Sequence, residues 1–134
     1  MISAIVIDTD VISYIFKGDT RSASYYPHLS GKLALISFMT LAELRQWALL
    51  RNWGDARRQQ LEDFLHDYIV IHSNHQLCSK WAEATRSAIR NGRPIDSADA
   101  WVAATALLHG APLVTHNRNH YVGIDGLILI SEAP

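Results

Sequence analysis

The stretch IVIDTDVIS, residues 5–13, decides the fold. Its apolar run Ile5 to Ile7 ends abruptly at the carboxylates Asp8 and Asp10, after which apolar residues resume. An apolar run without polar alternation is typical of a strand that is buried on both faces of a parallel sheet. Because ligand sites in open α/β sheets lie beyond the carboxyl ends of the strands, both acids stand where a site is expected.

The rest of the chain of 134 residues alternates apolar strands with helical segments. After a first strand at 4–7, further strands are predicted over 33–37, 68–71, 112–115 and 127–130. Helices are predicted over 11–17, 38–52, 55–67, 75–90 and 97–109, with a short helix around Pro27. This order predicts one α/β domain over residues 1–134, with a mainly parallel central sheet of about four to five strands and helices on both faces.

Composition excludes several classes of protein. Apolar residues make up 49% and charged residues 19% of the chain, which is typical of a soluble globular protein. The formal net charge of -1 provides no overall basic field, so a polyanion would be held locally or through a metal. The single Cys78 excludes a disulfide within the chain. Without a signal peptide or an apolar run of roughly 20 residues, we expect a cytoplasmic protein with no membrane association.

Polar residues recur at the predicted carboxyl edge of the sheet. Ser37 ends the second strand, Glu43 follows one helical turn later, and Thr115 and Asn117 end the fourth strand. Asp99 lies in the first turn of a helix that is apolar almost all round, and such helices are normally buried. A buried ionised acid needs a partner, and the three lysines are distant in sequence. Hard oxygen donors in this arrangement predict Mg²⁺ or Mn²⁺, as in metal-assisted phosphodiester cleavage.

Each acid also has a purely structural interpretation. Asp8 and Asp96 are suited to cap the helices that follow them. Thr40 and Glu43 fit a capping box, and Asp99 would be stabilised by the helix dipole in any case. Because these interpretations would all have to hold while three acids reach one edge of the sheet, we favour the metal site.

Four segments together resemble a PIN domain, specifically the VapC-type toxin ribonucleases of bacterial type II toxin–antitoxin pairs. They are IVIDTDVIS (5–13), ISFMTLAEL (36–44), DAWVAATALLHGAPLVT (99–115) and THNRNHY (115–121), in the order and at the spacing of the family. The resemblance implies three catalytic acids that hold Mg²⁺ or Mn²⁺: Asp8, Glu43 and Asp99.

Supporting or substrate-binding roles are expected for the remaining polar residues at this edge: Ser37, Thr40, Asp10, Asp96, Thr115, Asn117 and Arg118. Asp10 stands where many relatives have Asn, which favours a role in shaping the turn. Many relatives carry a fourth acid after the fourth strand, where this chain has Asn117 and His120. Whether one or two ions bind therefore stays open.

The resemblance implies an endoribonuclease in which water attacks phosphorus and leaves a 5′-phosphate and a 3′-hydroxyl. Single-stranded or looped RNA is the expected substrate, because its backbone reaches a recessed site more easily than a duplex does. A cognate antitoxin protein and a homodimer are also implied. Two other functions compete: a non-catalytic PIN scaffold that binds RNA or protein, and an aspartate-nucleophile phosphatase of the haloacid-dehalogenase type, whose first strand also ends in Asp-x-Asp.

Overall fold

The molecule is built around a central parallel sheet. The computed structural model describes residues 2–134. The five strands of the sheet are β1 (Ala4–Ile7), β2 (Leu33–Ser37), β3 (Ile69–Ile71), β4 (Leu113–Val114) and β5 (Leu129–Ile130). They lie in the order β3-β2-β1-β4-β5, and each neighbouring pair is parallel. The predicted α/β fold is confirmed. Because β1 is the middle strand, its carboxyl end opens at the centre of the sheet edge.

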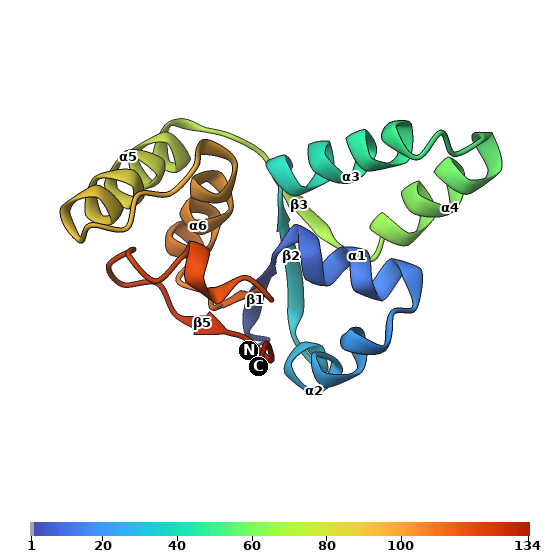
Figure 1. The fold of residues 1–134 in the computed structure, drawn as a ribbon, viewed down its shortest axis with the longest axis horizontal. Coiled ribbons are helices and arrows are strands. Elements are labelled where there is room, and N and C mark those ends of the chain that lie inside the picture. The colour runs from blue at the N-terminus through green and yellow to red at the C-terminus, as the bar shows by residue number, and fades with distance from the viewer. Residues whose placement is uncertain (1) are drawn as a thin grey trace.

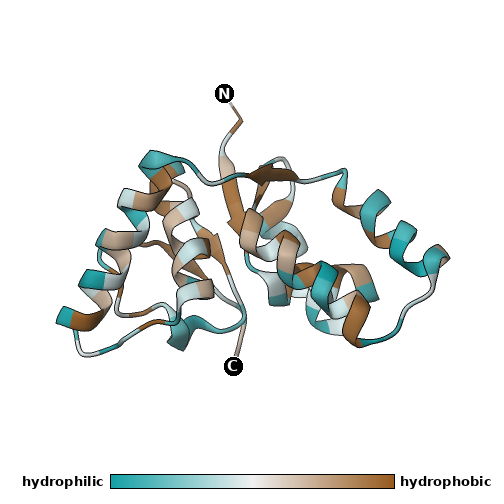
Figure 2. Cartoon of the chain, turned by 90° about the horizontal axis from the view of Figure 1, so that it is seen from above, coloured by the Kyte–Doolittle hydropathy of each residue, from teal (hydrophilic) through white to brown (hydrophobic). Residues whose placement is uncertain are grey.

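Helices cover both faces of the sheet (Figure 1). On one side lie α1 (Thr9–Lys17), the short turns η1 (Thr20–Ser24) and α2 (Tyr26–Leu29), α3 (Phe38–Leu50) and α4 (Asp55–Leu65). On the other side lie α5 (His75–Arg90) and α6 (Ser97–His109). A further short turn, η2 (Arg118–His120), follows β4. The two ends of the chain overlap in Figure 1 but lie on opposite sides in Figure 2, as expected when all strands run in one direction.

Successive residues of the central strands enter two different cores. Ile5 and Ile7 pack on the side of α1, α3 and α4, whereas Val6 between them packs on the side of α5 and α6. This alternation follows from strand geometry, which directs neighbouring side chains to opposite faces. Figure 2 shows that the strands are mostly hydrophobic and that the helices on either side of them carry both hydrophobic and hydrophilic residues.

The two cores are built from different residues. We call the first the aromatic side, after five large rings that pack around it: Phe16, Trp47, Trp53, Phe64 and Tyr68. We call the second the alanine side, after five small residues in its centre: Ala84, Ala88, Ala103, Ala106 and Ala111. None of the helices over residues 2–134 has the length and apolar character needed to cross a membrane.

The helix starts differ in part from the prediction. The cap predicted for Asp96 is confirmed, since it accepts a hydrogen bond from the backbone N–H of Asp99, and Asp8 also has the capping geometry that was its alternative role, since it accepts that of Thr9. The capping box of Thr40 and Glu43, which was the alternative to the favoured metal site, is contradicted. Ser37 caps α3 instead, with its hydroxyl 3.1 Å from the N–H of Met39, so Thr40 already lies inside the first helical turn.

Candidate active site

Asp8 lies at the centre of the site, at the end of β1, with 5% of its surface exposed. Its Oδ1 accepts the backbone N–H of Thr9 at 2.8 Å. Its Oδ2 accepts the hydroxyl groups of Thr115 at 2.8 Å and Tyr121 at 2.9 Å. Burial raises the pKa of Asp8, and these hydrogen bonds act in the opposite direction.

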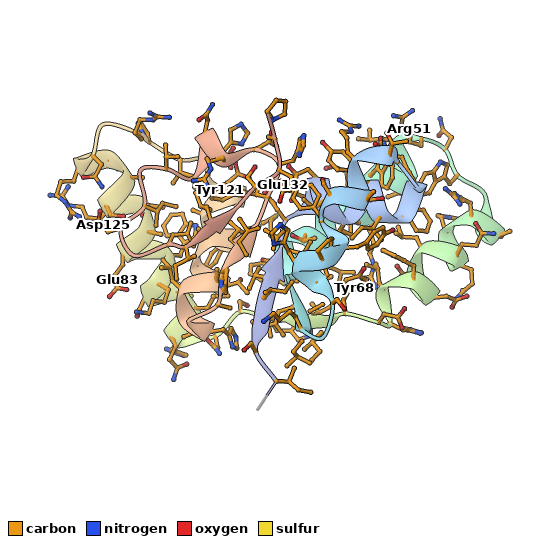
Figure 3. All side chains as sticks on the ribbon, turned by 90° about the horizontal axis from the view of Figure 1, so that it is seen from below. Arg51, Tyr68, Glu83, Tyr121, Asp125 and Glu132 are labelled. Atoms are coloured by element: carbon orange, nitrogen blue, oxygen red, sulfur yellow. The ribbon has the colours of Figure 1, made fainter. Side chains whose placement is uncertain are left out.

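Tyr121 connects Asp8 to Asp99. Its hydroxyl lies 2.9 Å from Asp8 Oδ2 and 3.2 Å from Asp99 Oδ1, and it projects from the C-terminal segment that follows η2 (Figure 3). The other oxygen of Asp99 lies 3.0 Å from His120 Nδ1. Burial, and next the charge of Asp8, raises the pKa of Asp99 to about 6. Because a tyrosine hydroxyl has one hydrogen for two carboxylates, this pair of acids favours a bound proton or cation.

Thr9 connects Asp8 to Glu43 on the opposite flank. Its backbone N–H binds Asp8, and its hydroxyl donates to Glu43 Oε1 at 2.7 Å. The hydroxyl of Thr40, fully buried, lies 3.0 Å from that of Thr9. Burial raises the pKa of Glu43, the hydrogen bond from Thr9 acts in the opposite direction, and the charge of Asp8 adds a smaller increase. The structure therefore brings the three acids together, with Asp8 between Glu43 and Asp99.

Asp10 lies at the same edge but faces the loop after β4. Its Oδ2 accepts the backbone N–H of His116 at 3.0 Å, and its Oδ1 accepts that of Val11 at 2.7 Å. Burial, and next the charge of Asp8, raises the pKa of Asp10 to about 7. Both oxygens of Asp10 are thus engaged with backbone groups, which is the geometry of a residue that shapes a turn.

The other predicted residues surround the three acids but do not connect one acid to another. Thr115 is fully buried and is itself held by the backbone N–H of Asn117, which lies 3.0 Å from its hydroxyl. Asp96 and Ser37 act as helix caps, of α6 and α3. Arg118 is exposed, and its guanidinium lies 3.5 Å from the carbonyl oxygen of Leu129.

The side chains of the acids are not arranged as a complete set of metal ligands. Over residues 2–134, no three His, Cys, Asp or Glu side chains are arranged to hold a metal ion, and the hydroxyls of Thr9 and Tyr121 lie between the carboxylates. The donor set nevertheless fits a hard cation, because it consists of carboxylate oxygens. Burial raises the pKa of all four acids, and mutual repulsion adds to the shifts of Asp10, Glu43 and Asp99. A divalent cation would compensate this charge.

Sequence reasoning missed Thr9 and Tyr121, although both stand inside motifs that it singled out. Thr9 separates the two acids of the first motif, and its hydroxyl reaches a residue 34 positions away. Tyr121 ends the last motif and lies 113 positions from Asp8. A buried tyrosine needs a partner for its hydroxyl, which is a signal for such a contact, but the partner is apparent only in the fold.

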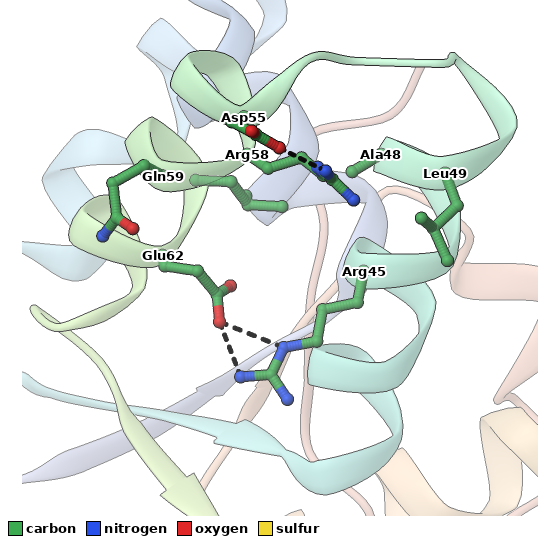
Figure 4. A pocket seen from close by; sticks show the side chains of 8 residues that line it. Arg45, Ala48, Leu49, Asp55, Arg58, Gln59 and Glu62 are labelled. Carbon is green, nitrogen blue, oxygen red and sulfur yellow. Dashed lines mark hydrogen bonds and ion pairs between the residues drawn. The ribbon is translucent and has the colours of Figure 1, made fainter.

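A separate cavity of about 490 Å³ lies between α3 and α4 (Figure 4). Arg45 of α3 reaches across it to Glu62 of α4 at 2.6 Å, and Arg58 pairs with Asp55 within α4. The three acids are not among its lining residues, so it is distinct from the candidate active site.

Known proteins are similar to this chain in sequence. The model of the PIN domain matches residues 5–123. A ribonuclease VapC1 of Haemophilus influenzae (strain R2866) is 27% identical over 124 residues, which cover 91% of this chain and 92% of the relative. A ribonuclease VapC1 of Methanocaldococcus jannaschii is 26% identical over 120 residues, which cover 89% of this chain and 79% of the relative.

Solved structures share the fold over nearly the whole chain. VapBC2 from Rickettsia felis, bound to a promoter DNA fragment, aligns with a TM-score of 0.82 at 22% identity and covers 96% of this chain and 98% of that chain. VapBC-1 from nontypeable Haemophilus influenzae aligns with a TM-score of 0.75 at 25% identity, covering 96% and 97%. Because the family model covers residues 5–123, which is most of the chain and includes all three acids, the chain belongs to the PIN-domain family.

Proposed function

We propose that this protein is a toxin-type endoribonuclease that requires Mg²⁺ or Mn²⁺ and hydrolyses phosphodiester bonds of single-stranded or looped RNA. The observation that carries the proposal is the line of acids at the carboxyl edge of the sheet, in which Thr9 connects Asp8 to Glu43 and Tyr121 connects Asp8 to Asp99. The relatives named ribonuclease VapC1 support it, since they match about nine tenths of the chain.

The residues of the chain have distinct tasks in this reaction. Asp8, Glu43 and Asp99 would hold the ion, while Thr115, Thr9 and Tyr121 fix the directions of their oxygens. When bound, a divalent ion supplies polarisation of the phosphate and activation of water. The water oxygen attacks phosphorus and the bond to the 3′ oxygen breaks. That oxygen takes up a proton, and the 5′-phosphate stays on the following nucleotide.

The decisive experiment sequences newly formed 5′-phosphate ends after incubation of total cellular RNA with the purified protein and Mn²⁺ or Mg²⁺. We expect discrete new ends that disappear with EDTA and in Asp99→Asn. Asp63→Asn is the matched control, because it removes one carboxylate on the exposed surface of α4, and it should cleave like the unaltered protein.

Two outcomes would contradict the proposal. A protein that binds Mn²⁺ by calorimetry but produces no new ends would be a binding scaffold. A protein that instead releases phosphate from small phosphoesters and traps a phosphate on Asp8 would be a phosphatase. The match to the PIN domain weighs against that second outcome.

We also propose that a cognate antitoxin controls the protein and that it forms a homodimer. A solved toxin–antitoxin complex from Klebsiella pneumoniae supports the antitoxin, since it aligns with 93% of this chain at a TM-score of 0.74. Light scattering of the purified chain, alone and after expression with the neighbouring reading frame, tests both. A monomer that no neighbouring protein joins would contradict them.

A further inference from the structure

A polar cavity of about 260 Å³ adjoins the acids, between the loop after β4 and the residues after β5. The side chains that matter are those of His116, Asn117, Arg118, Asn119, His120 and Ser131. We propose that this cavity binds the nucleotide next to the scissile phosphate of single-stranded RNA, with His116 donating a hydrogen bond to its base and Arg118 contacting its phosphate. This subsite rests on the proposed nuclease function.

Hydrogen bonds connect three residues in the wall of the cavity, His116, Asn117 and His120, to the acids. The backbone N–H of His116 binds Asp10 at 3.0 Å, and His120 Nδ1 lies 3.0 Å from Asp99. The backbone N–H of Asn117 binds the Thr115 hydroxyl, which in turn binds Asp8. A phosphate held at the acids would therefore have its neighbouring nucleotide at this wall.

The imidazole of His116 is held in one tautomer. Tyr25 is fully buried, and its hydroxyl accepts the backbone N–H of Glu132 at 3.0 Å and lies 2.5 Å from His116 Nδ1. Over residues 2–134 the Tyr25 hydroxyl has two hydrogen-bond partners, and because it accepts the N–H of Glu132, Nδ1 of His116 is the acceptor left for its own hydrogen. The neutral ring then carries its own hydrogen on Nε2, which points away from Tyr25.

The ring is also fixed in orientation. Its centroid lies 5.4 Å from that of Tyr14 and 5.7 Å from that of Tyr25, both at steep interplanar angles of 85° and 72°. A donor with a fixed position and tautomer distinguishes a base that presents an acceptor from one that presents a donor. The cavity should therefore select among bases and not merely tolerate them.

The charge of the cavity suits a nucleotide. Among its lining residues in the described chain, none has a carboxylate side chain, and Arg118 supplies a full positive charge. The amides of Asn117 and Asn119 add further donors at the rim. The adjoining acids repel a phosphate unless a cation compensates them, whereas Arg118 attracts it directly.

The test measures binding separately from cleavage. Four fluorescent RNA octamers that differ at one central base are titrated with the protein in Ca²⁺ by fluorescence anisotropy, at several salt concentrations, and a gel verifies that the RNA stays intact. We expect the unaltered protein to prefer one base. Arg118→Ala should make the slope of log affinity against log salt shallower by about 0.7, the value for one phosphate contact on a single strand.

His116→Phe keeps the ring between Tyr14 and Tyr25 but removes the donor. We expect a loss of affinity of about fivefold for the preferred octamer, the typical effect of one hydrogen bond, with no change in the salt slope. Tyr25→Phe keeps His116 but releases its tautomer. This variant should abolish the base preference. It should lower the affinity for the preferred octamer by only about twofold, since roughly half of the imidazole rings still present the donor.

Arg86→Ala is the matched control, because it removes an exposed arginine of α5 that does not line the cavity. Equal changes in salt slope for Arg86→Ala and Arg118→Ala would overturn the subsite, as would a base preference that survives His116→Phe. If the variants change base-selective binding as expected but the unaltered protein cleaves no RNA, the subsite is supported and the nuclease function fails. If RNA is cleaved but the variants bind like the unaltered protein, the reverse holds.

Discussion

The aromatic side and the alanine side of the sheet support the same site with opposite kinds of packing. On the aromatic side, Phe16 lies 5.2 Å from Phe64 and Trp47 lies 4.7 Å from Trp53 between ring centroids. On the alanine side, α6 presents fully buried alanines to the sheet and to α5. Large rings fill the space between separated elements, whereas alanines let backbones approach closely.

This difference affects how each acid is held. Asp99 lies in the first turn of α6, and most of the residues that follow it in this helix are buried, so the position of its backbone is set by close contacts. Glu43 lies on α3, which extends together with α4 away from the sheet (Figure 1). The far end of α3 exposes the side chains of Leu49 and Leu50. The comparison indicates that the alanine side tolerates no added volume and that the aromatic side tolerates no lost volume.

The largest expected effect comes from removing volume on the aromatic side. Leu44 is fully buried next to Glu43. Leu44→Ala should lower the free energy of unfolding by about 2–5 kcal/mol, because a cavity remains where the side chain was. Urea denaturation measures it, with the exposed Leu49→Ala as control, expected to change stability by less than about 0.5 kcal/mol. Equal effects of the two variants would contradict the assignment of the core.

Adding volume on the alanine side should have the next largest effect. Ala103 is fully buried between α6 and the sheet. Ala103→Leu should destabilise the protein by about 1–3 kcal/mol, because the close contacts leave no room for three further carbons. Ala82→Leu, at an exposed position of α5, makes the same change without burial and should be nearly neutral. A neutral Ala103→Leu would remove the distinction between the two sides.

Two threonines that donate hydrogen bonds to the acids allow the two sides of the site to be compared. Thr115→Val removes a donor to the buried Asp8, and Thr9→Val removes one to the half-buried Glu43. We expect the affinity for Mn²⁺, measured by calorimetry, to fall about 10–100-fold for Thr115→Val and about tenfold for Thr9→Val, as for residues that orient metal ligands. The exposed Thr20→Val should bind Mn²⁺ normally. Unchanged affinity in both variants would mean that the acids bind no ion here.

The smallest effect concerns pH. The pKa of Asp99 is raised to about 6 and that of Asp10 to about 7, each mainly by burial. Between pH 4 and 7 the folded state therefore binds more protons than the unfolded state, so the free energy of unfolding falls as pH rises through this range. Because both carboxyls are partly solvated, we expect a loss on the order of 1 kcal/mol in EDTA.

Urea denaturation at pH 5 and pH 8 measures this loss, and Asp10→Asn should reduce it. Mn²⁺ at pH 8 should restore the stability, since a cation that binds the folded state stabilises it. A stability that rises from pH 5 to pH 8 in EDTA would show that the acids are compensated within the protein itself.

The sheet and its edge could be predicted because they depend on local patterns. The run Ile5–Ile7 predicts a buried strand, and the alternation of such runs with helices predicts parallel pairing and a common carboxyl edge. The helix α5 has the predicted bounds, since Asn74 caps its start and Asn91-Gly92 ends it. The strands β4 and β5 are shorter than predicted, although Pro112, Thr115 and Ile128 just outside them still form backbone hydrogen bonds to neighbouring strands.

The contacts among the acids could not be predicted, because they join residues far apart in the chain. That Tyr121 would reach Asp8 and Asp99 depends on the register of β1 with β4 and on the turn η2. The capping box failed for a local reason, since Ser37 and Thr40 are both good caps and the strand end decides between them.

The place of Tyr121 in the chain has a consequence for the order of synthesis. The acids emerge from the ribosome early, at residue 8, midway, at residue 43, and late, at residue 99, and the hydroxyl that joins the first to the last follows at residue 121. The central strand β1 likewise gains its neighbour β4 only after residue 113. A nascent chain folds from its N-terminus, so every shorter intermediate lacks the assembled site. Any activity of this site therefore begins only after residue 121 has been translated.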